Sequence, residues 1–432
     1  SKNLKEFVYM RKYARYKDSG ISWIGDVPEH WNCLKIKRLF DEDDEKNENG
    51  EFELLSFSKN KGLIYYKDNN EKEPSAGDLT KYRVVHKGQL LENRMQAWHG
   101  MFICVDKEGC VSPDYSVFNA NKRTVGSVKY YEYCFRLPMW VQQFANESRG
   151  IGDGFNRLYT SQFHKIMAIV PPPSEQKAIA EYLDKKTAQI NELVSAKQKQ
   201  IELLKEYKQS VIANAVTGKM NKNRRMKDSG ISWIGKIPEN WEVKRVASFF
   251  DENKVLNKDF SFKKAYQFKF GTLVMKNEVG DEKDYEETYV KYTVLKKNDI
   301  VLNGLNLNYD FVSQRVAICP TPGIITSAYI AMTPRKTIEA MYYLWLFKTM
   351  DNKKMLHGMG SGIRLTLSFS DMKNQRIPVP PLSEQKEIVA YIEKKVSFID
   401  SQIASIEKQI VNLNEYKQSL ISDVVTGKVK VC

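Results

Sequence analysis

The side chains with the clearest chemistry are amides and basic residues, gathered in short polar segments between apolar runs. The first half of the chain has such segments at 56–61, 93–99 and 119–123, and the second half has them at 303–309 and 313–315. Arginine reads guanine and asparagine or glutamine reads adenine through paired hydrogen bonds, whereas lysine and arginine also hold phosphates. The alternative for each residue is ordinary solvated surface. We predict DNA contacts from Lys59, Lys61, Asn93, Arg94, Gln96, Lys122, Arg123, Asn303, Asn306, Gln314 and Arg315.

Two glycine-rich segments, G-I-G-D-G at 150–154 and G-M-G-S-G at 358–362, suggest a different chemistry. Neither has the strand before it and the helix after it that a dinucleotide-binding fingerprint requires, and no Gly-Lys-Ser/Thr follows. We predict loops whose backbone approaches a phosphate, with Arg157 and Arg364 as phosphate ligands. A plain turn is the alternative.

Motifs for catalysis are missing from the sequence. There is no (Asn/Asp)-Pro-Pro-(Tyr/Phe) methyltransferase motif, and Ser112-Pro113-Asp114-Tyr115 resembles it only in part. The chain also has no Walker A loop, and its five histidines lack metal-ligand spacing. We therefore predict a non-catalytic chain that holds no metal and no cofactor of its own.

Composition narrows the class of protein. The 432 residues suggest two to four domains at ~150 residues each, and a hydrophobic content of 42% excludes a disordered chain. The net charge of +14 favours a polyanionic partner, which is either nucleic acid or a membrane surface. No apolar run reaches the ~18 residues of a bilayer-spanning helix, and the first residues do not resemble a secretory signal. Together with six cysteines that lack disulfide spacing, these features predict a cytoplasmic protein.

A long internal repeat organises the chain. The segment K-D-S-G-I-S-W-I-G at 17–25 recurs at 227–235, 210 residues later. Further along, S-E-Q-K at 174–177 recurs at 383–386 and V-T-G-K at 216–219 recurs at 425–428, each 209 residues later. A period this long indicates a duplicated unit of many elements, because solenoid repeats have periods of 20–50 residues. The ends of the two copies match closely and their interiors diverge, which indicates one scaffold with two differently specialised modules.

The repeated C-terminal segment of each copy is predicted to be a long helix. Ser174 and Ser383 are the expected N-caps, and Gly218 and Gly427 the expected stops. Between these signals lie ~43 residues without proline or glycine, or about 65 Å of helix. In the second helix Ile392, Ile399, Ile406, Leu413 and Leu420 are seven residues apart, which is a heptad seam.

The obvious partner for each seam is the other seam in the same chain, although ordinary amphipathic core helices are the alternative. Parallel packing would force the second module to bridge ~65 Å between opposite ends of the coil. We therefore predict an antiparallel intramolecular coiled coil and a dumbbell with pseudo-two-fold symmetry.

The divergent interiors alternate strand-like runs with polar loops, as in an α+β module of about 150 residues. Strands are expected at 83–85, 101–105, 315–319 and 324–326, and helices at 129–146 and 337–350. The aromatic residues of both helices are expected in the core rather than on a binding surface. The predicted organisation is an N-terminal extension (1–16), a first module (17–173), a first long helix (174–218), a basic linker (219–226), a second module (227–382), a second long helix (383–426) and a C-terminal tail (427–432).

These repeated motifs resemble a known family. The S-G-I-S-W-I-G…P-E-x-W opening, the P-P-x-S-E-Q-K helix start, the E-Y-K-Q-S…V-T-G-K end and their duplication are similar to the specificity subunits of Type I restriction–modification systems. The resemblance covers essentially residues 17–430. It implies that the two modules are target-recognition domains, each reading one half of a bipartite double-stranded DNA sequence, with the two helices as the coil between them.

The resemblance also implies partner subunits. Two modification subunits would carry S-adenosylmethionine and methylate an adenine in each half-site, and restriction subunits would add translocation and cleavage with ATP and Mg²⁺. A scaffold that holds two methyltransferases without reading DNA is the main alternative. The variable modules differ between members of the family, so no base-reading residue is assigned by resemblance.

Overall fold

A computed structural model describes residues 11–58, 61–68, 78–150, 156–221, 223–276, 283–360 and 365–431. The chain divides into two compact units. The first comprises residues 1–196 and 408–432, and the second comprises residues 197–407. Each unit therefore contains one module together with part of each long helix.

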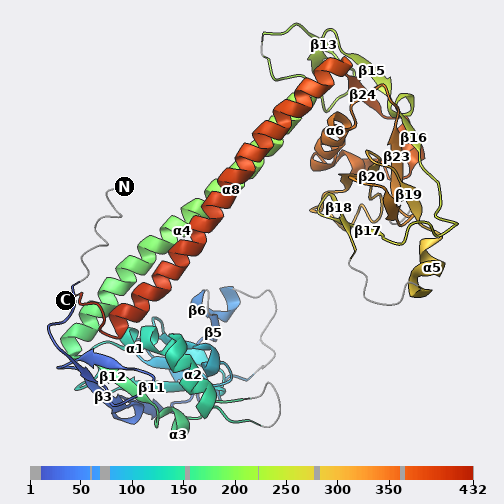
Figure 1. Cartoon of the computed structure of the whole chain (residues 1–432). Helices are drawn as coiled ribbons and strands as arrows, with labels where there is room; N and C mark the ends of the chain where they lie inside the picture. The colour runs from blue at the N-terminus through green and yellow to red at the C-terminus, as the bar shows by residue number, and fades with distance from the viewer. Residues whose placement is uncertain are drawn as a thin grey trace. The chain divides into compact units, whose positions relative to one another are not determined.

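A four-stranded antiparallel sheet lies at the centre of each module (Figure 1). The order is β4-β11-β8-β9 in the first unit and β16-β23-β20-β21 in the second, so the two copies share one topology. In the first unit the strands are β4 (Phe40–Asp43), β8 (Leu90–Asn93), β9 (Phe102–Cys104) and β11 (Tyr115–Ala120). In the second they are β16 (Phe250–Glu252), β20 (Ile300–Leu302), β21 (Val316–Ile318) and β23 (Ile330–Pro334).

Two-stranded antiparallel sheets surround the central sheet and repeat in the same way. The pairs of the first unit are β1 (Tyr16–Asp18) with β2 (Asp26–Pro28), β3 (Asn32–Lys35) with β12 (Met167–Val170), β5 (Leu55–Ser58) with β6 (Gly62–Tyr65), and β7 (Arg83–Val85) with β10 (Gly109–Val111). Those of the second are β13 (Met226–Asp228) with β14 (Lys236–Pro238), β15 (Glu242–Arg245) with β24 (Arg376–Val379), β17 (Tyr266–Lys269) with β18 (Thr272–Met275), and β19 (Thr293–Leu295) with β22 (Gly323–Ile325).

Short helices complete the modules. Those of the first unit are α1 (Val128–Phe135), α2 (Pro138–Glu147), α3 (Thr160–Phe163) and the 3₁₀ helices η2 (Ile36–Arg38), η3 (Tyr66–Asp68) and η4 (Ala97–His99). Those of the second are α5 (Lys283–Tyr289), α6 (Ala340–Asn352), α7 (Phe369–Lys373), η5 (Val246–Ser248) and η6 (Met355–Gly358).

The single helix expected at 129–146 is wrong, because the chain forms α1 and α2 there. Leu137 is extended, with φ −73° and ψ 143°, and Pro138 occupies the first turn of α2. A proline disfavours helical geometry in the residue before it, so the chain breaks at Leu137. Part of the polar segment at 56–61 forms a strand and not a loop, since β5 covers Leu55–Ser58.

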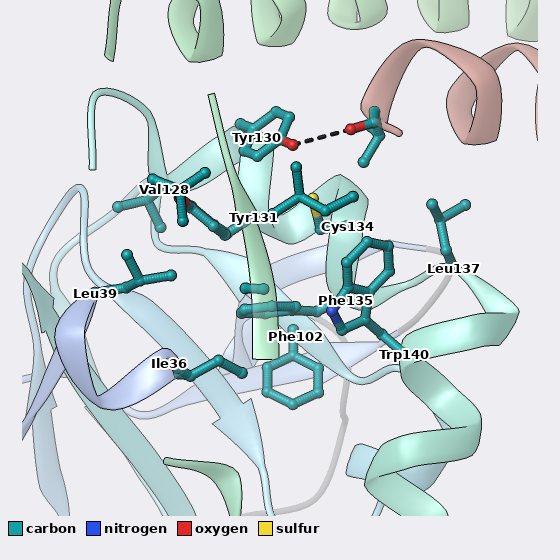
Figure 2. Close-up of a cluster of buried hydrophobic side chains, with 14 of the residues drawn as sticks. Ile36, Leu39, Phe102, Val128, Tyr130, Tyr131, Cys134, Phe135, Leu137 and Trp140 are labelled. Carbon is teal, nitrogen blue, oxygen red and sulfur yellow. Dashed lines mark hydrogen bonds between the residues drawn. The ribbon is translucent and has the colours of Figure 1, made fainter. Parts of the chain in front are cut away.

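Most aromatic residues of α1, α2 and α6 lie in the core, as expected, whereas Tyr133 and Trp345 are half-buried. Tyr130, Phe135 and Trp140 are fully buried in the first unit, where they pack with Phe102 and Ile36 (Figure 2). In the second unit Tyr342, Tyr343 and Phe347 are fully buried as well. Adjacent residues of a central strand can both be apolar because both faces of the sheet are covered. Leu90 and Leu91, for example, point into different hydrophobic clusters on the two faces.

The long helices are α4 (Pro173–Val216) and α8 (Leu382–Val425), each of 44 residues. In the first unit Leu183 and Ile190 near the start of α4 share a core with Leu420 and Val424 near the end of α8. In the second unit the end of α4 packs against the start of α8, with Ile212 and Ala215 beside Ile388 and Ile392. The two helices are therefore antiparallel within each unit, as predicted.

Two lysines of the long helices have polar partners across the helix pair. Nζ of Lys417 donates to Oδ1 of Asn191 at 2.9 Å in the first unit. Nζ of Lys208 meets Oδ1 of Asp400 at 2.7 Å in the second unit. These contacts let a charged residue occupy an otherwise apolar seam.

The helix ends are close to their predicted positions. Each long helix begins one residue earlier than expected, at Pro173 and Leu382, so Ser174 and Ser383 lie in the first turn and are not the N-caps. The glycine stops are confirmed, since Gly218 and Gly427 adopt φ values of +74° and +75° directly after the helices.

Within the described residues, no helix is both long and apolar enough to cross a membrane. Five of the six cysteines lie in this part of the chain, and all five are free thiols.

Replacing Gly427 with alanine should destabilise the first unit. A Cβ atom there would lie 2.5 Å from Cδ of Pro28, and the positive φ is itself unfavourable for alanine. We expect the free energy of unfolding to fall by about 1–3 kcal/mol, measured by urea denaturation. Gly50→Ala is the matched control, because Gly50 has φ +70° with no atom within 4 Å of the added Cβ. Equal losses from both variants would contradict the predicted close contact.

Candidate nucleic-acid interface

In the first module, four predicted DNA-contacting residues come together where strand β8 ends. Asn93 closes the strand, and its Oδ1 accepts the backbone N–H of Met95 at 3.1 Å, which turns the chain. Its Nδ2 donates to the Tyr115 hydroxyl at 3.3 Å across the sheet. Gln96 follows this turn and is exposed. The side chain of Asn93 thus shapes the turn that presents Gln96.

Arg94 and Arg157 meet at the turn that precedes β11. Nε of Arg94 donates to the carbonyl oxygen of Asp114 at 3.2 Å, and its terminal nitrogen donates to the carbonyl of Pro113. The Arg157 guanidinium forms an ion pair with the Asp114 carboxylate at 3.2 Å. Arg149 joins this group, because its backbone forms two 2.9 Å hydrogen bonds with that of Arg157. Sequence reasoning missed Arg149, since nothing local marks it as a partner of Arg157.

The other basic residues predicted in the first module lie elsewhere. Lys122 and Arg123 are exposed on the turn after β11, at the opposite end of that strand from Tyr115. A six-residue strand spans about 17 Å, so these two residues do not join the group around Asn93. Lys61 is exposed in the turn between β5 and β6, and Lys59 lies outside the described residues.

The second module repeats the turn with different side chains. Asn303 follows β20, and its Oδ1 accepts the N–H of Leu305 at 3.2 Å, as Asn93 does for Met95. Asn306 is exposed and has a positive φ of 53°. Gln314 is half-buried, and its amide donates to Oδ1 of Asn352. Equivalent positions therefore carry different polar groups in the two modules.

Arg315 holds this loop from inside. Its side chain is 2% exposed, and its guanidinium donates to the carbonyls of Leu305 and Asp310 at 2.8 Å each. Weaker hydrogen bonds reach the carbonyls of Asn303 and Asn306 at 3.3 and 3.4 Å. The sequence suggested a base-reading arginine, whereas the fold uses Arg315 to close the loop. Burial was not visible in the sequence, because arginine is rarely buried.

Exposed apolar side chains surround the same loop and were not predicted. Val312 is 92% exposed, Phe270 is 85% exposed and Tyr309 is 74% exposed. Gly271, next to Phe270, lies against the Gln314 side chain, where an added Cβ would lie 2.7 Å from the Cβ of Gln314. Apolar side chains of this kind can contact thymine methyl groups.

The glycine-rich segments are only partly described. Residues 151–155 and 361–364, including Arg364, lie outside the described residues. Gly360 packs against the protein itself, because an added Cβ would lie 2.9 Å from Cδ1 of Leu307 and from the carbonyl carbon of Leu365. In the described ranges, no group of three or more His, Cys, Asp or Glu residues is arranged to hold a metal ion.

A buried carboxylic acid lies directly beneath the turn of the first module. Glu92 is 0% exposed, and neither of its carboxyl oxygens has a hydrogen-bond partner. Burial raises the pKa of this group well above its ordinary value, which outweighs the attraction of Arg94. The equivalent residue in the second module is Leu302, directly before Asn303.

Comparison with known proteins connects this arrangement to DNA specificity proteins. Residues 238–414 match the family described as the Type I restriction modification DNA specificity domain. The EcoBI specificity subunit of a Type I restriction enzyme from Escherichia coli is 24% identical over 60% of this chain and 58% of its own length. The match thus spans just over half of that relative. The putative MjaX specificity subunit of Methanocaldococcus jannaschii is 21% identical over 94% of this chain and 96% of its own.

Solved structures share the fold. A structure reported for complex assembly and conformational transition of the type I R-M system has a TM-score of 0.68 at 13% identity, covering 92% of this chain and 98% of that chain. The HsdS subunit from Thermoanaerobacter tengcongensis has a TM-score of 0.54 at 15% identity, covering 93% and 98%. Residues 238–414 are therefore similar to a Type I DNA specificity domain. The resemblance of the chain to the specificity subunits of Type I restriction–modification systems is confirmed.

Replacing Glu92 with leucine, the residue of the second module, should stabilise the first unit. The folded-state pKa is raised, so the wild-type carboxyl favours folding only below its ordinary pKa of 4.5, and this stability is lost as pH rises. We expect Glu92→Leu to raise the free energy of unfolding by about 1–3 kcal/mol at neutral pH and by less near pH 5. Urea denaturation across this pH range measures the difference. Glu48→Leu, at an exposed position, is the control, and a pH-independent gain at Glu92 would contradict the assignment.

Proposed function

We propose that this chain is the DNA-recognition subunit of a Type I restriction–modification complex. Each module reads one half of a bipartite double-stranded DNA target, and the coiled coil sets the spacing between the halves. The chain then directs adenine methyltransferase and restriction subunits to that target.

One observation carries this proposal: the same turn recurs in both modules with different exposed side chains. Asn93 and Asn303 form the turn in the same way, through hydrogen bonds of 3.1 and 3.2 Å to the N–H two residues later. The exposed residue that follows is Gln96 in one module and Asn306 in the other. A protein that reads two different half-sites requires such a shared scaffold with divergent contacts.

The reading surface proposed for each module follows from exposure. In the first module it includes Gln96 for bases and Arg94, Arg157 and Arg149 for phosphates. In the second it includes Asn306, Gln314 and the apolar side chains of Phe270 and Val312. Arg315 is left out, because its guanidinium is buried and bound to backbone carbonyls.

The partners belong to the same proposal. Two modification subunits would supply S-adenosylmethionine, and restriction subunits would supply ATP- and Mg²⁺-dependent translocation and cleavage. The chain itself would be non-catalytic and would act in the cytoplasm. Its net charge of +14 favours a polyanionic partner such as DNA.

A scaffold that holds two methyltransferases without reading DNA is the second candidate, because the antiparallel helices alone would suit that role. A standalone DNA-binding regulator is weaker, because no helix-turn-helix or zinc-finger signature is present in the sequence. Binding of the complex to specific and to random DNA can be measured at increasing salt. Sequence-specific binding survives salt concentrations that abolish non-specific binding, so this measurement distinguishes a DNA-recognition subunit from a scaffold.

Single substitutions in one module should alter only one half-site. Gln96→Ala removes an exposed amide, and Asn306→Gly removes another while suiting the positive φ of 53° at that position. We expect each to relax the sequence at one position of one half-site, with a loss of about 1–3 kcal/mol of discrimination. Genome-wide methylation mapping with the cognate modification subunits measures this. Lys122→Ala is the control for a general charge effect, and a change in both half-sites would refute independent reading.

Lengthening both long helices should lengthen the spacer. Seven extra residues in each helix preserve the heptad seam and add about 10.5 Å, which corresponds to about three base pairs. We expect the methylated sites to keep both half-sites and to gain about three unspecified base pairs between them. Methylation at the original spacing would contradict the role of the coil as a ruler.

A further inference from the structure

The second unit contains a cavity of about 430 Å³. It adjoins the loop at residues 303–315, which is called the reading loop below. The cavity lies between α6, the last turns of α4 and the first half of α8. Its polar lining is mainly cationic, with Lys205, Lys208 and Lys348 against Asp400 as the one acidic residue among those that line it. Gln314 of the reading loop lines the same cavity.

Two residues that line this cavity have a donor without an acceptor. Nε1 of Trp345 is buried and has no hydrogen-bond partner in the described part of the chain. Nζ of Lys348 lies 5.5 Å from the centre of the Trp345 ring, and no carboxylate of the described residues pairs with it. Lys208 is already neutralised by Asp400 at 2.7 Å. The unsatisfied positive charge is therefore concentrated at Lys348.

The first unit provides an internal comparison. Tyr130 and Tyr342 are equivalent, because their hydroxyls donate to the last carbonyl of α8 and of α4, respectively, at 2.9 Å. Trp345 then corresponds to Tyr133, whose hydroxyl donates to Oδ1 of Asp184 at 2.7 Å. Lys348 corresponds to Arg136, which pairs with Glu132 at 3.0 Å.

In the second unit neither of these interactions is present. Glu393 occupies the position of Asp184, yet Nε1 of Trp345 has no hydrogen-bond partner. Leu344 occupies the position of Glu132, four residues before the cation. The donors satisfied within the protein in one copy are thus left unsatisfied in the other, and they line a cavity. Burial lowers the pKa of Lys348 and the nearby Lys208 lowers it further, whereas the nearby Asp351 raises it. A bound anion would also raise this pKa and so oppose the lowering.

We propose that this cavity binds a phosphate group through Lys348 and the Trp345 N–H, beside the ion pair of Lys208 with Asp400. A phosphate suits these donors because it offers several acceptor oxygens in different directions, whereas a carboxylate offers two. The source is either the backbone of DNA held at the reading loop or a free phosphate compound. Binding of a DNA backbone phosphate rests on the proposed function, because Gln314 belongs to both the cavity and the reading loop. Binding of a free phosphate compound does not rest on it.

The first experiment uses the full chain without DNA. Inorganic phosphate and pyrophosphate are titrated by calorimetry against wild type, Lys348→Met, Trp345→Phe and the control Lys394→Met, which removes an exposed lysine from α8. For a free phosphate ligand we expect saturable binding by wild type and Lys394→Met. Binding should be at least tenfold weaker for Lys348→Met and measurably weaker for Trp345→Phe, which keeps the ring and removes only the N–H.

The second experiment measures the salt dependence of target-DNA binding by the chain in complex with its modification subunits. For a backbone phosphate, Lys348→Met should reduce the slope of log affinity against log salt by about 0.9, and Lys394→Met should leave it unchanged. If neither phosphate affinity nor the salt slope distinguishes Lys348→Met from Lys394→Met, the site is refuted. If the wild-type complex binds no specific DNA while the chain alone binds phosphate, the proposed function is refuted and this site is not.

Discussion

Each module is joined to a long helix through one buried glutamine in the first turn of that helix. Oε1 of Gln176 accepts the N–H of Gly126 at 2.9 Å, and its Nε2 donates to the carbonyls of Thr124 and Pro171 at 2.8 Å each. Gln385 repeats this, accepting from Glu339 and donating to Pro380 at 2.8 Å each. Buried amides are costly unless every group is paired, so this contact fixes how a module meets its helix. The orientation of each proposed reading loop relative to its own stretch of coil depends on it.

The repeated opening motif seals the same junction. Trp31 is fully buried, and its indole N–H donates to Glu175 at 3.0 Å, beside bonds from Tyr13 at 2.9 Å and His30 at 2.6 Å. Burial alone would raise the pKa of Glu175, but these hydrogen bonds outweigh it and lower the pKa. In the first copy the opening motif and the helix start are therefore structural. The parts that differ are the loops at the ends of β8 and β20, where two DNA half-sites would be distinguished.

The sequence predicted the scaffold better than the site. The predicted seams and glycine stops depend on local spacing, and the structure agrees with them to within a residue or two. The predicted DNA-contacting residues are all amides or basic residues, yet the fold gives them different roles. Arg315 is buried as a loop support, Asn93 and Asn303 form turns, and Gln96 and Asn306 remain exposed. Exposure depends on packing against distant segments, which local sequence does not encode.

What the sequence determined by itself was the duplicated unit, the long helices and their antiparallel pairing, since these follow from repeat offsets, heptad spacing and chain connectivity. Only the tertiary structure decided which polar groups are satisfied. Arg136 and Lys348 occupy equivalent positions, but only Arg136 has a carboxylate partner, because the residues around the two cations differ. Glu92 and Leu302 are also equivalent, and only Glu92 leaves buried polar atoms unpaired. A hydrogen bond depends on the distance between two atoms that are remote in the chain, so the unsatisfied donors around Lys348 became visible only after folding.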